Sequence, residues 1–204
     1  MISKTVLLCL LSYLLGSIPW GVVLTRLFSD VDVTSEGSRN IGAFNVFRVA
    51  GKTLGLLTLV ADVLKGAVPV LVATWWIGVP GWPGELLVCL VALSAFAGHL
   101  FPIFLGFKGG KGVATAAGCF VVIAPFAFFI SALVYILVIC WTGYSSAGSL
   151  FAATILPGAI WLSSHSVPVT VCALIIAVGI YIRHAENIRN LIKGTEHSPL
   201  RPER

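Results

Sequence analysis

The sequence contains few charged residues. Only 10% of its 204 residues are Asp, Glu, Lys or Arg, whereas 58% are hydrophobic, and the mean hydropathy is +1.01. This composition lies far outside the range of soluble globular domains. The scarcity of charge therefore excludes a soluble enzyme and predicts an integral membrane protein.

Cysteine-based sites are also missing from the sequence. All five cysteines lie inside apolar segments, with no Cys-x-x-Cys pair and no Cys/His spacing typical of a metal site. We expect them to be small core residues rather than disulfides or metal ligands. No metal and no cofactor is expected.

The net charge of +5 is not organised for nucleic-acid binding. The Lys and Arg residues lie beside apolar runs, and no basic helix or aromatic RNA-binding motif surrounds them. Membrane orientation and anionic ligands explain these cations better.

The cations are concentrated in three polar segments between apolar runs. Eleven of the thirteen lie at positions 26–52, 108–111 and 183–204, named here the first, second and third polar segments. Positive charge marks cytoplasmic loops, and positions 78–84 and 163–166 contain no Lys or Arg. We predict that all three polar segments lie on the cytoplasmic face.

The run from Val113 to Trp141 decides the predicted number of spans. It is about 29 residues, or roughly 43 Å as one helix, and a single crossing would place the third polar segment outside. A break at Pro125 allows two short crossings instead. The prediction is an all-α bundle of about seven spans in a single domain, residues 1–204, with the N-terminus outside, the C-terminus cytoplasmic and a loose tail at 197–204. The predicted spans are 4–27, 53–77, 85–105, 112–124, 127–142, 147–162 and 167–183.

The first polar segment has the composition of an anion-binding loop. Between Ser35 and Arg48 it combines hydroxyl, amide and guanidinium groups with glycines. Ser and Asn give neutral hydrogen bonds, Arg gives a two-pronged donor, and Gly allows backbone amides to approach an oxyanion. The alternative is a solvated connection whose charge serves topology only.

The second polar segment predicts a glycine loop that opens a helix. Residues 106–115 carry Lys108 and Lys111 among glycines, and a helix N-terminus attracts anions. A Walker A motif is excluded, because Leu105 stands at its first glycine and Gly112 follows Lys111. A glycine-rich turn with topological lysines is the alternative.

The third polar segment places an imidazole beside an amide if the last helix continues. His184, Asn187 and Ile188 then share one face, although a basic amphipathic anchor would look the same. Glu196 is expected to brace the tail through a charged hydrogen bond.

Three further polar residues lie within the apolar runs. Asp62 and Lys65 are three residues apart on a predicted span, so they can neutralise each other, either for function or as a structural brace. His99 is expected to be a helix-packing histidine.

Together these residues resemble the acyl-phosphate-dependent glycerol-3-phosphate acyltransferase family of bacterial membranes. The resemblance covers essentially the whole chain. It is carried by Gly37 to Asn40, Gly42 to Asn45 with Arg48, Asp62 with Lys65 and Gly66, His99 with Phe101 and Pro102, Phe107 to Thr115, His184 with Asn187 and Ile188, and Gly194 to Glu196. Arg39 stands where the family has glycine and Phe44 where it has threonine, which is expected to change the local loop geometry.

The resemblance implies transfer of a fatty acyl group from acyl phosphate to the 1-hydroxyl of sn-glycerol 3-phosphate, giving lysophosphatidic acid and phosphate for phospholipid synthesis. It implies catalytic roles for Ser38, Asn40, Arg48, His184 and Asn187. It implies substrate binding by Asn45, Lys108, Gly109, Gly110, Lys111, Gly112 and Ser146. Either His184 or a substrate phosphate oxygen would accept the proton.

The same resemblance implies a multi-pass protein of the bacterial inner membrane with a cytoplasmic active site. Its partners would be the two substrates, membrane lipid and the enzyme that makes acyl phosphate, with no nucleic acid.

Two other classes are weaker interpretations of the sequence. A transporter of an anionic metabolite predicts midplane polar groups and repeated halves, but only Asp62 and Lys65 are placed there and no repeat is evident. Metal-dependent lipid phosphotransferases need an aspartate cluster, and the chain has only three aspartates. No histidine begins the His-x4-Asp motif of soluble-type acyltransferases.

Overall fold

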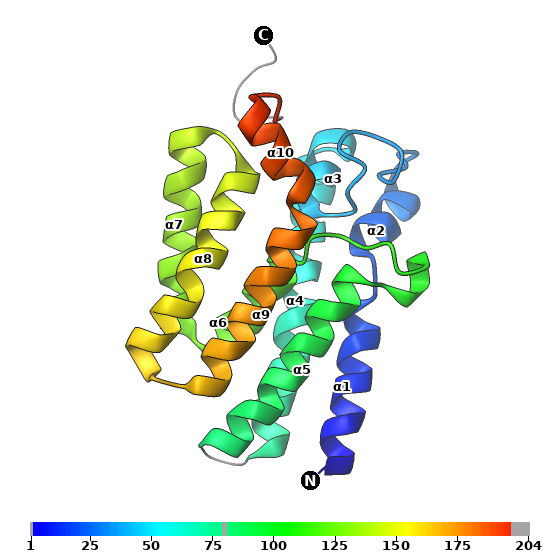
Figure 1. The fold of residues 1–204 in the computed structure, drawn as a ribbon. Helices are drawn as coiled ribbons and strands as arrows, with labels where there is room; N and C mark the ends of the chain where they lie inside the picture. Colours follow the sequence, from blue (N-terminus) through cyan, green and yellow to red (C-terminus); the bar gives the residue numbers. More distant parts are fainter. Residues whose placement is uncertain (1, 79–80, 197–204) are drawn as a thin grey trace. The chain divides into compact units, whose positions relative to one another are not determined.

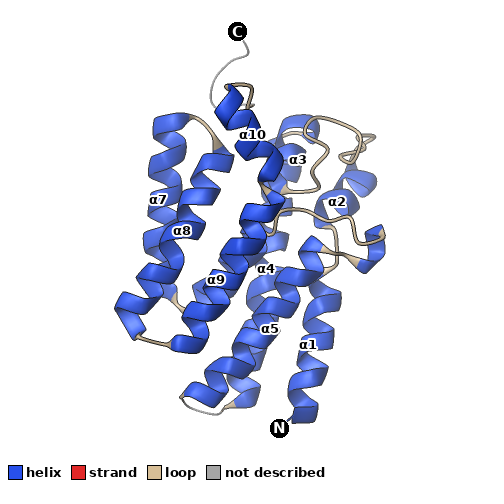
Figure 2. Cartoon of the chain, viewed as in Figure 1, coloured by secondary structure: helices blue, strands red, loops and turns tan. Residues whose placement is uncertain are grey.

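The computed structural model describes residues 2–78 and 81–196, and this part of the chain is helical, with loops and no strand (Figures 1 and 2). The predicted tail at 197–204 lies outside the described residues. In chain order the elements are α1 (Ile2–Gly16), α2 (Trp20–Phe28), α3 (Ala43–Ala50), α4 (Lys52–Ile77), α5 (Trp82–Leu100), the 3-10 helix η1 (Ile103–Leu105), α6 (Val113–Ile123), α7 (Pro125–Thr142), α8 (Ser145–Ser164), α9 (Val167–Arg183) and α10 (Ala185–Lys193).

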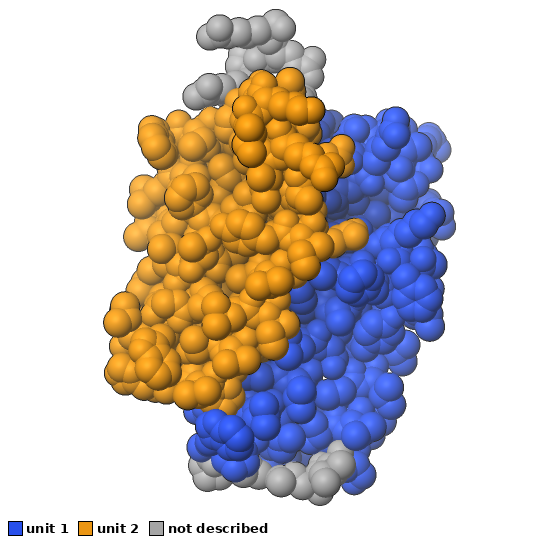
Figure 3. All heavy atoms as spheres, viewed as in Figure 1, with its two compact units in different colours: residues 1–122 blue, residues 123–204 orange. Residues whose placement is uncertain are grey.

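The chain divides into two compact units, residues 1–122 and 123–204, which Figure 3 distinguishes by colour. In the first unit α1, α4 and α5 pack against one another, and α2 and α3 pack against α4. In the second unit α8 packs against both α7 and α9, and α10 contacts α8 and α9. The predicted single domain stays a prediction.

Four helical stretches are long and apolar enough to cross a membrane: α4, residues 82–105, α7 and α8. The bent pairs α1/α2 and α9/α10 raise this number to as many as six within the described residues. The predicted all-helical, polytopic membrane architecture is therefore confirmed. Helix α6 has 11 residues and is about 17 Å long, shorter than the hydrocarbon core of roughly 30 Å, so the count of seven spans and their orientation stay predictions.

Helix breaks agree with the sequence at two places and differ from it at one. The predicted break at Pro125 is confirmed, because α6 ends at Ile123 and α7 begins at Pro125. The predicted first span is two helices bent by 42° around Pro19, which has no N–H to continue the α1 ladder. The predicted last span, 167–183, coincides with α9, and a bend of 58° at His184 separates it from α10.

Glycines allow the helices of the first unit to approach closely. A Cβ at Gly118 of α6 would overlap the Val63 carbonyl oxygen of α4, and a Cβ at Gly66 of α4 would overlap the Thr115 carbonyl oxygen. Close backbone contact through small residues is typical of helix packing in membranes. Any larger residue at either glycine would force α4 and α6 apart.

A small apolar core lies beneath the first polar segment. Val33 and Ile41 of the α2–α3 loop are buried with Val22 of α2 and Val46 of α3. Two apolar side chains thus anchor a loop of mostly exposed polar residues, which is the long loop between α2 and α3 in Figure 2. The core fixes both ends of this loop on the helices.

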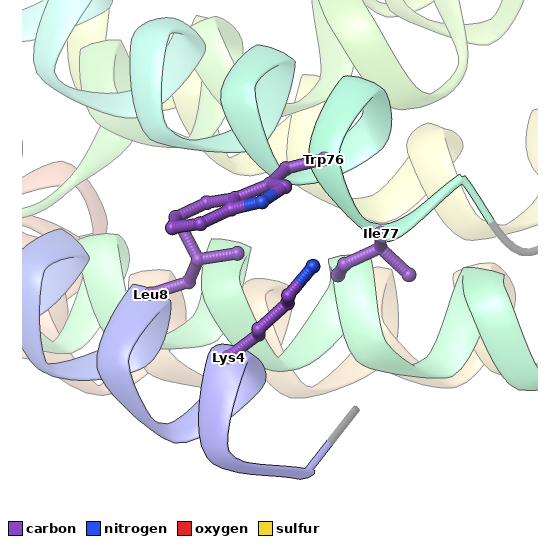
Figure 4. Close-up of a pocket in the computed structure, with 4 residues that line it drawn as sticks. All are labelled: Lys4, Leu8, Trp76 and Ile77. Atoms are coloured by element: carbon purple, nitrogen blue, oxygen red, sulfur yellow. The ribbon is translucent and has the colours of Figure 1, made fainter.

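A pocket lies at the carboxyl end of α4, the end away from α3. It is lined by Lys4, Leu8, Trp76 and Ile77 (Figure 4). The Lys4 ammonium lies 5.6 Å from the centre of the Trp76 ring. This cation–π contact involves the charged residue among the four that line the pocket. None of the predicted site residues lines this pocket.

Candidate functional site

The α2–α3 loop is held in shape by the side chain of Asn45. Its Oδ1 accepts the Ser38 amide hydrogen bond at 2.8 Å, and its Nδ2 donates to the Val33 and Glu36 carbonyls at 3.0 and 3.1 Å. Asn45 is only 2% exposed. Its amide therefore organises the loop backbone, and its predicted direct contact with substrate stays a prediction.

The predicted catalytic residues of this loop lie close together in the chain and face solvent to different degrees. Ser38 and Arg48 are exposed, Arg48 in the last turn of α3, whereas Asn40 is half-buried. The Asn40 Oδ1 accepts the Gly42 amide hydrogen bond at 2.9 Å, so this side chain shapes the turn before α3. Arg39 has a φ of 56°, which confirms that this position needs the left-handed backbone that glycine adopts at the least cost.

The beginning of the same loop is stabilised by Asp32. Its Oδ1 accepts hydrogen bonds from the Thr34 hydroxyl at 2.6 Å and the Thr34 amide at 2.9 Å. These bonds hold the pKa of the Asp32 carboxyl below its usual value, with the hydroxyl bond as the largest cause. Asp32 is therefore a charged turn former rather than a proton donor.

The second polar segment runs over the carboxyl end of α5. The Gly109 amide donates to the Leu100 carbonyl at 3.2 Å, and the Gly110 amide donates to the His99 carbonyl at 3.1 Å. A Cβ at Gly110 would overlap the His99 ring. These two amides satisfy the last carbonyls of α5, and the predicted substrate binding by Gly109 and Gly110 stays a prediction.

The remaining donors of this segment lie at the start of α6. Gly112 has a φ of 78° and leads directly into α6, whose first-turn amides have no partner within the helix. Lys108 is exposed and Lys111 is half-buried. Two lysines in the loop that leads to the positive end of a helix favour a phosphate group there.

An ion pair is buried behind the second polar segment. Lys65 Nζ lies 2.9 Å from Asp62 Oδ1, as the sequence predicts, and also donates to the Ile18 carbonyl at 2.8 Å. His99 Nδ1 lies 3.8 Å from the same Asp62 oxygen and 3.2 Å from the Thr115 hydroxyl. His99 thus packs between helices, as expected, but within a polar cluster.

The second unit brings Ser146 and Asn187 together on one carboxylate. The Ser146 hydroxyl donates to Glu196 Oε1 at 2.6 Å, and the Asn187 amide donates to the same oxygen at 2.7 Å. The charged hydrogen bond expected of Glu196 is therefore present. Glu196 connects the start of α8 with α10, and no pattern in the sequence indicates Ser146 as its partner.

His184 lies at the bend between α9 and α10 and is only 2% exposed. Its Nδ1 is 2.8 Å from the Ile180 carbonyl, which can only accept, so Nδ1 carries a hydrogen. In the neutral ring Nε2 is then the basic nitrogen. A shared face with Asn187 is expected only if the last helix continues, and the helix bends at His184 instead; the Asn187 amide is held by Glu196.

The sequence missed Thr115 and Ile18 as partners of the buried polar cluster. Both contacts depend on tertiary packing, and a backbone carbonyl such as that of Ile18 leaves no signal in a sequence. In the described residues no group of three or more His, Cys, Asp or Glu side chains is placed to hold a metal ion.

The apolar helices and the glycine- and cation-containing loops define a helical membrane protein with loops suited to phosphate groups. The family model for glycerol-3-phosphate acyltransferase matches residues 6–194. The chain is 44% identical over 191 residues to the glycerol-3-phosphate acyltransferase of Syntrophotalea carbinolica, covering 94% of this chain and 95% of the relative. It is 49% identical over 193 residues to that of Anaeromyxobacter dehalogenans strain 2CP-1, covering 93% and 94%.

A solved structure agrees with the sequence relatives. The glycerol 3-phosphate form of PlsY (YgiH), an integral membrane glycerol 3-phosphate acyltransferase, superposes with a TM-score of 0.89 at 37% identity. The likeness covers 96% of this chain and 95% of that one, and the lysophosphatidic acid form of PlsY gives a TM-score of 0.88. The chain belongs to the glycerol-3-phosphate acyltransferase family and is an acyltransferase.

Proposed function

We propose that this enzyme transfers a fatty acyl group from acyl phosphate to the 1-position of sn-glycerol 3-phosphate, forming lysophosphatidic acid and phosphate. The acceptor rests on one observation, the likeness over 96% of the chain to an acyltransferase solved in its glycerol 3-phosphate form. We place the reaction on the cytoplasmic face of the bacterial inner membrane, in a chain of seven spans with its N-terminus outside. An enzyme that makes acyl phosphate would be its supplier.

The glycerol 3-phosphate dianion is assigned to Arg48 and the second polar segment. Arg48 offers a two-pronged, permanently charged donor from α3, and its exposure leaves the guanidinium available to a soluble ligand. Lys108 and Lys111 add charge at the start of α6. The acyl-phosphate head is assigned to Ser38 and Asn40.

The acyl donor is already activated, which simplifies the chemistry. The 1-hydroxyl oxygen of glycerol 3-phosphate attacks the acyl carbonyl carbon, the bond from that carbon to the phosphate oxygen breaks, and phosphate leaves with the electron pair. The hydroxyl proton passes to His184 Nε2 or to a phosphate oxygen. The protein then needs chiefly to align two anions and stabilise the developing oxyanion.

The donor is tested with purified protein, radiolabelled glycerol 3-phosphate and three donors: palmitoyl phosphate, palmitoyl-CoA and palmitoyl acyl carrier protein. Labelled lysophosphatidic acid should form with palmitoyl phosphate and not with the thioesters. Product formed only from a thioester would overturn the proposed donor. No product with any of the three would overturn the proposed reaction.

The proposed roles of two side chains are tested by substitution. Arg48→Ala should raise the KM for glycerol 3-phosphate about 10- to 100-fold, because it removes a charged hydrogen-bonding partner of the phosphate. Arg48→Lys keeps the charge but loses the planar fork. Its KM for glycerol 3-phosphate should therefore lie between those of the unchanged enzyme and Arg48→Ala. Unchanged KM and kcat in Arg48→Ala would refute the assignment.

His184 is tested by His184→Ala and His184→Gln. If His184 Nε2 accepts the proton, both variants should lose about 100-fold or more in kcat with little change in either KM. Near-normal turnover of either variant at saturating substrates would instead assign the proton to a phosphate oxygen of a substrate.

A further inference from the structure

We propose that the buried cluster of Asp62, Lys65, His99 and Thr115 is a positioning device that holds the second polar segment in its ligand-binding shape. For the identity of that ligand this inference rests on the proposed function. None of the four is assigned a contact with substrate. They would act through Gly109 and Gly110.

His99 forms the support behind the glycine loop. Its carbonyl accepts the Gly110 amide at 3.1 Å, and its ring fills the space that a Cβ at Gly110 would need. The neighbouring Leu100 carbonyl accepts the Gly109 amide at 3.2 Å. Movement of the His99 ring or of the α5 end would therefore move the loop that carries Lys108 and Lys111.

On the other side, one hydroxyl hydrogen-bonds the His99 ring and one carboxylate lies near it. The Thr115 hydroxyl of α6 lies 3.2 Å from Nδ1, and the Asp62 carboxylate of α4 lies 3.8 Å from the same nitrogen. All three side chains are at most 4% exposed. Contact with both α4 and α6 fixes the ring against the start of the helix into which the loop leads.

Lys65 extends the cluster to the first polar segment. It neutralises Asp62 at 2.9 Å and donates to the Ile18 carbonyl at 2.8 Å, where the chain bends between α1 and α2. Helix α2 leads directly into the loop that carries Ser38. The cluster thus connects the bases of both polar segments of the first unit.

The energetics favour positioning over simple stabilisation. Removing two charges from water costs several kcal/mol per ion, and well-packed apolar residues of similar volume often give equal or greater stability than a buried pair. Buried charged and polar groups are best attested where they specify one arrangement. The arrangement specified here is the glycine loop.

The decisive test compares Thr115→Val with Thr115→Ser. Val is nearly isosteric but has no hydroxyl, whereas Ser keeps it. We expect Thr115→Val to raise the KM for glycerol 3-phosphate about tenfold. Its KM for palmitoyl phosphate should stay within twofold of that of the unchanged enzyme. Thr115→Ser should have the KM for glycerol 3-phosphate of the unchanged enzyme. Equal KM values in the two variants, or a parallel rise for both substrates, would overturn the inference.

Ser12→Ala provides a matched control for lost stability. Its hydroxyl is also buried and bonds a helix carbonyl, that of Val91, at 2.8 Å, but it contacts neither His99 nor the loop. Thermal unfolding should show similar losses in Ser12→Ala and Thr115→Val, while only Thr115→Val changes the KM. A tenfold rise in the KM for glycerol 3-phosphate in Ser12→Ala as well would mean that general destabilisation causes the rise in Thr115→Val.

Hydrogen exchange tests the loop independently of any reaction. Peptides covering residues 106–115 should exchange about tenfold faster in Thr115→Val than in Ser12→Ala. If no donor supports turnover, the proposed function fails, but faster exchange here would still support the positioning role. Unchanged exchange in an active enzyme would overturn the positioning role and leave the proposed function standing.

The double variant Asp62→Asn/Lys65→Met provides a second route should Thr115→Val not fold. It removes both charges together, so no uncompensated ion stays buried. We expect a folded protein with a raised KM for glycerol 3-phosphate, accompanied by a raised KM for palmitoyl phosphate because Lys65 also contacts the base of the first polar segment. A folded double variant with both KM values unchanged would overturn the inference.

Discussion

Replacement of Asn45 should separate the shape of the first polar segment from its chemistry. The Asn45 amide makes three hydrogen bonds, one accepted from Ser38 and two donated to Val33 and Glu36, and it is buried. At about 1 kcal/mol for each bond, Asn45→Ala should lower the free energy of unfolding by about 3 kcal/mol. Asn45→Asp keeps the size and the bond to Ser38 but turns an oxygen toward two carbonyls.

Asn45→Asp, which keeps the size of the side chain, therefore provides the sharper test. Because a carboxylate oxygen then faces two carbonyl oxygens and no donor lies between them, Asn45→Asp should cost at least about 2 kcal/mol, the value of the two lost bonds. Denaturant unfolding in detergent gives the free energy, and hydrogen exchange of residues 33–42 locates the loss. If Asn45→Asp unfolds within 0.5 kcal/mol of the unchanged protein, a change well below one hydrogen bond, the hydrogen-bonding account of this loop is wrong.

Two further substitutions test backbone geometry. Arg39→Gly should raise the free energy of unfolding by about 0.5–1 kcal/mol, because it relieves a left-handed residue at φ 56° at some cost in unfolded-state entropy. Arg39→Ala keeps the backbone strain and is the control. Equal gains in stability for both variants in a thermal unfolding assay would assign the effect to the lost charge. Gly118→Ala should destabilise the protein by about 2 kcal/mol or more, since a Cβ would overlap the Val63 carbonyl. Gly158→Ala, where a Cβ meets nothing within 4 Å, is its control, and similar thermal stability of the two variants would contradict the close-packing argument.

Local signals in the sequence predict much of the fold. Apolar length predicts α4 almost to the residue, and proline chemistry predicts the break at Pro125. The break near Pro19 was not predicted, because the apolar run continues through it and the Lys65 contact with the Ile18 carbonyl is tertiary. Sequence periodicity cannot show such contacts.

In the candidate site too, local features could be predicted from the sequence and tertiary contacts could not. Residue types and their spacing indicate which segments carry the hydroxyl, amide and cationic groups of the candidate site. The spacing of three residues on one helix also predicts the Asp62–Lys65 pair. The direction of the glycine amides was not predictable, since Gly109 and Gly110 bond to α5 carbonyls only after the loop folds over that helix. The bend at His184, where the imidazole bonds the Ile180 carbonyl, is likewise not marked by a proline in the sequence.

The placement of Asp62 and Lys65 on one helix also bears on how the chain enters the bilayer. A charge alone at the centre of a span opposes insertion. Since these two are three residues apart on α4, they can cancel before α4 meets any other helix, and the helix can enter as an electrically neutral segment. The same pair divided between two helices would leave each one charged until they met, so this arrangement makes insertion of α4 independent of the order in which the rest of the protein assembles.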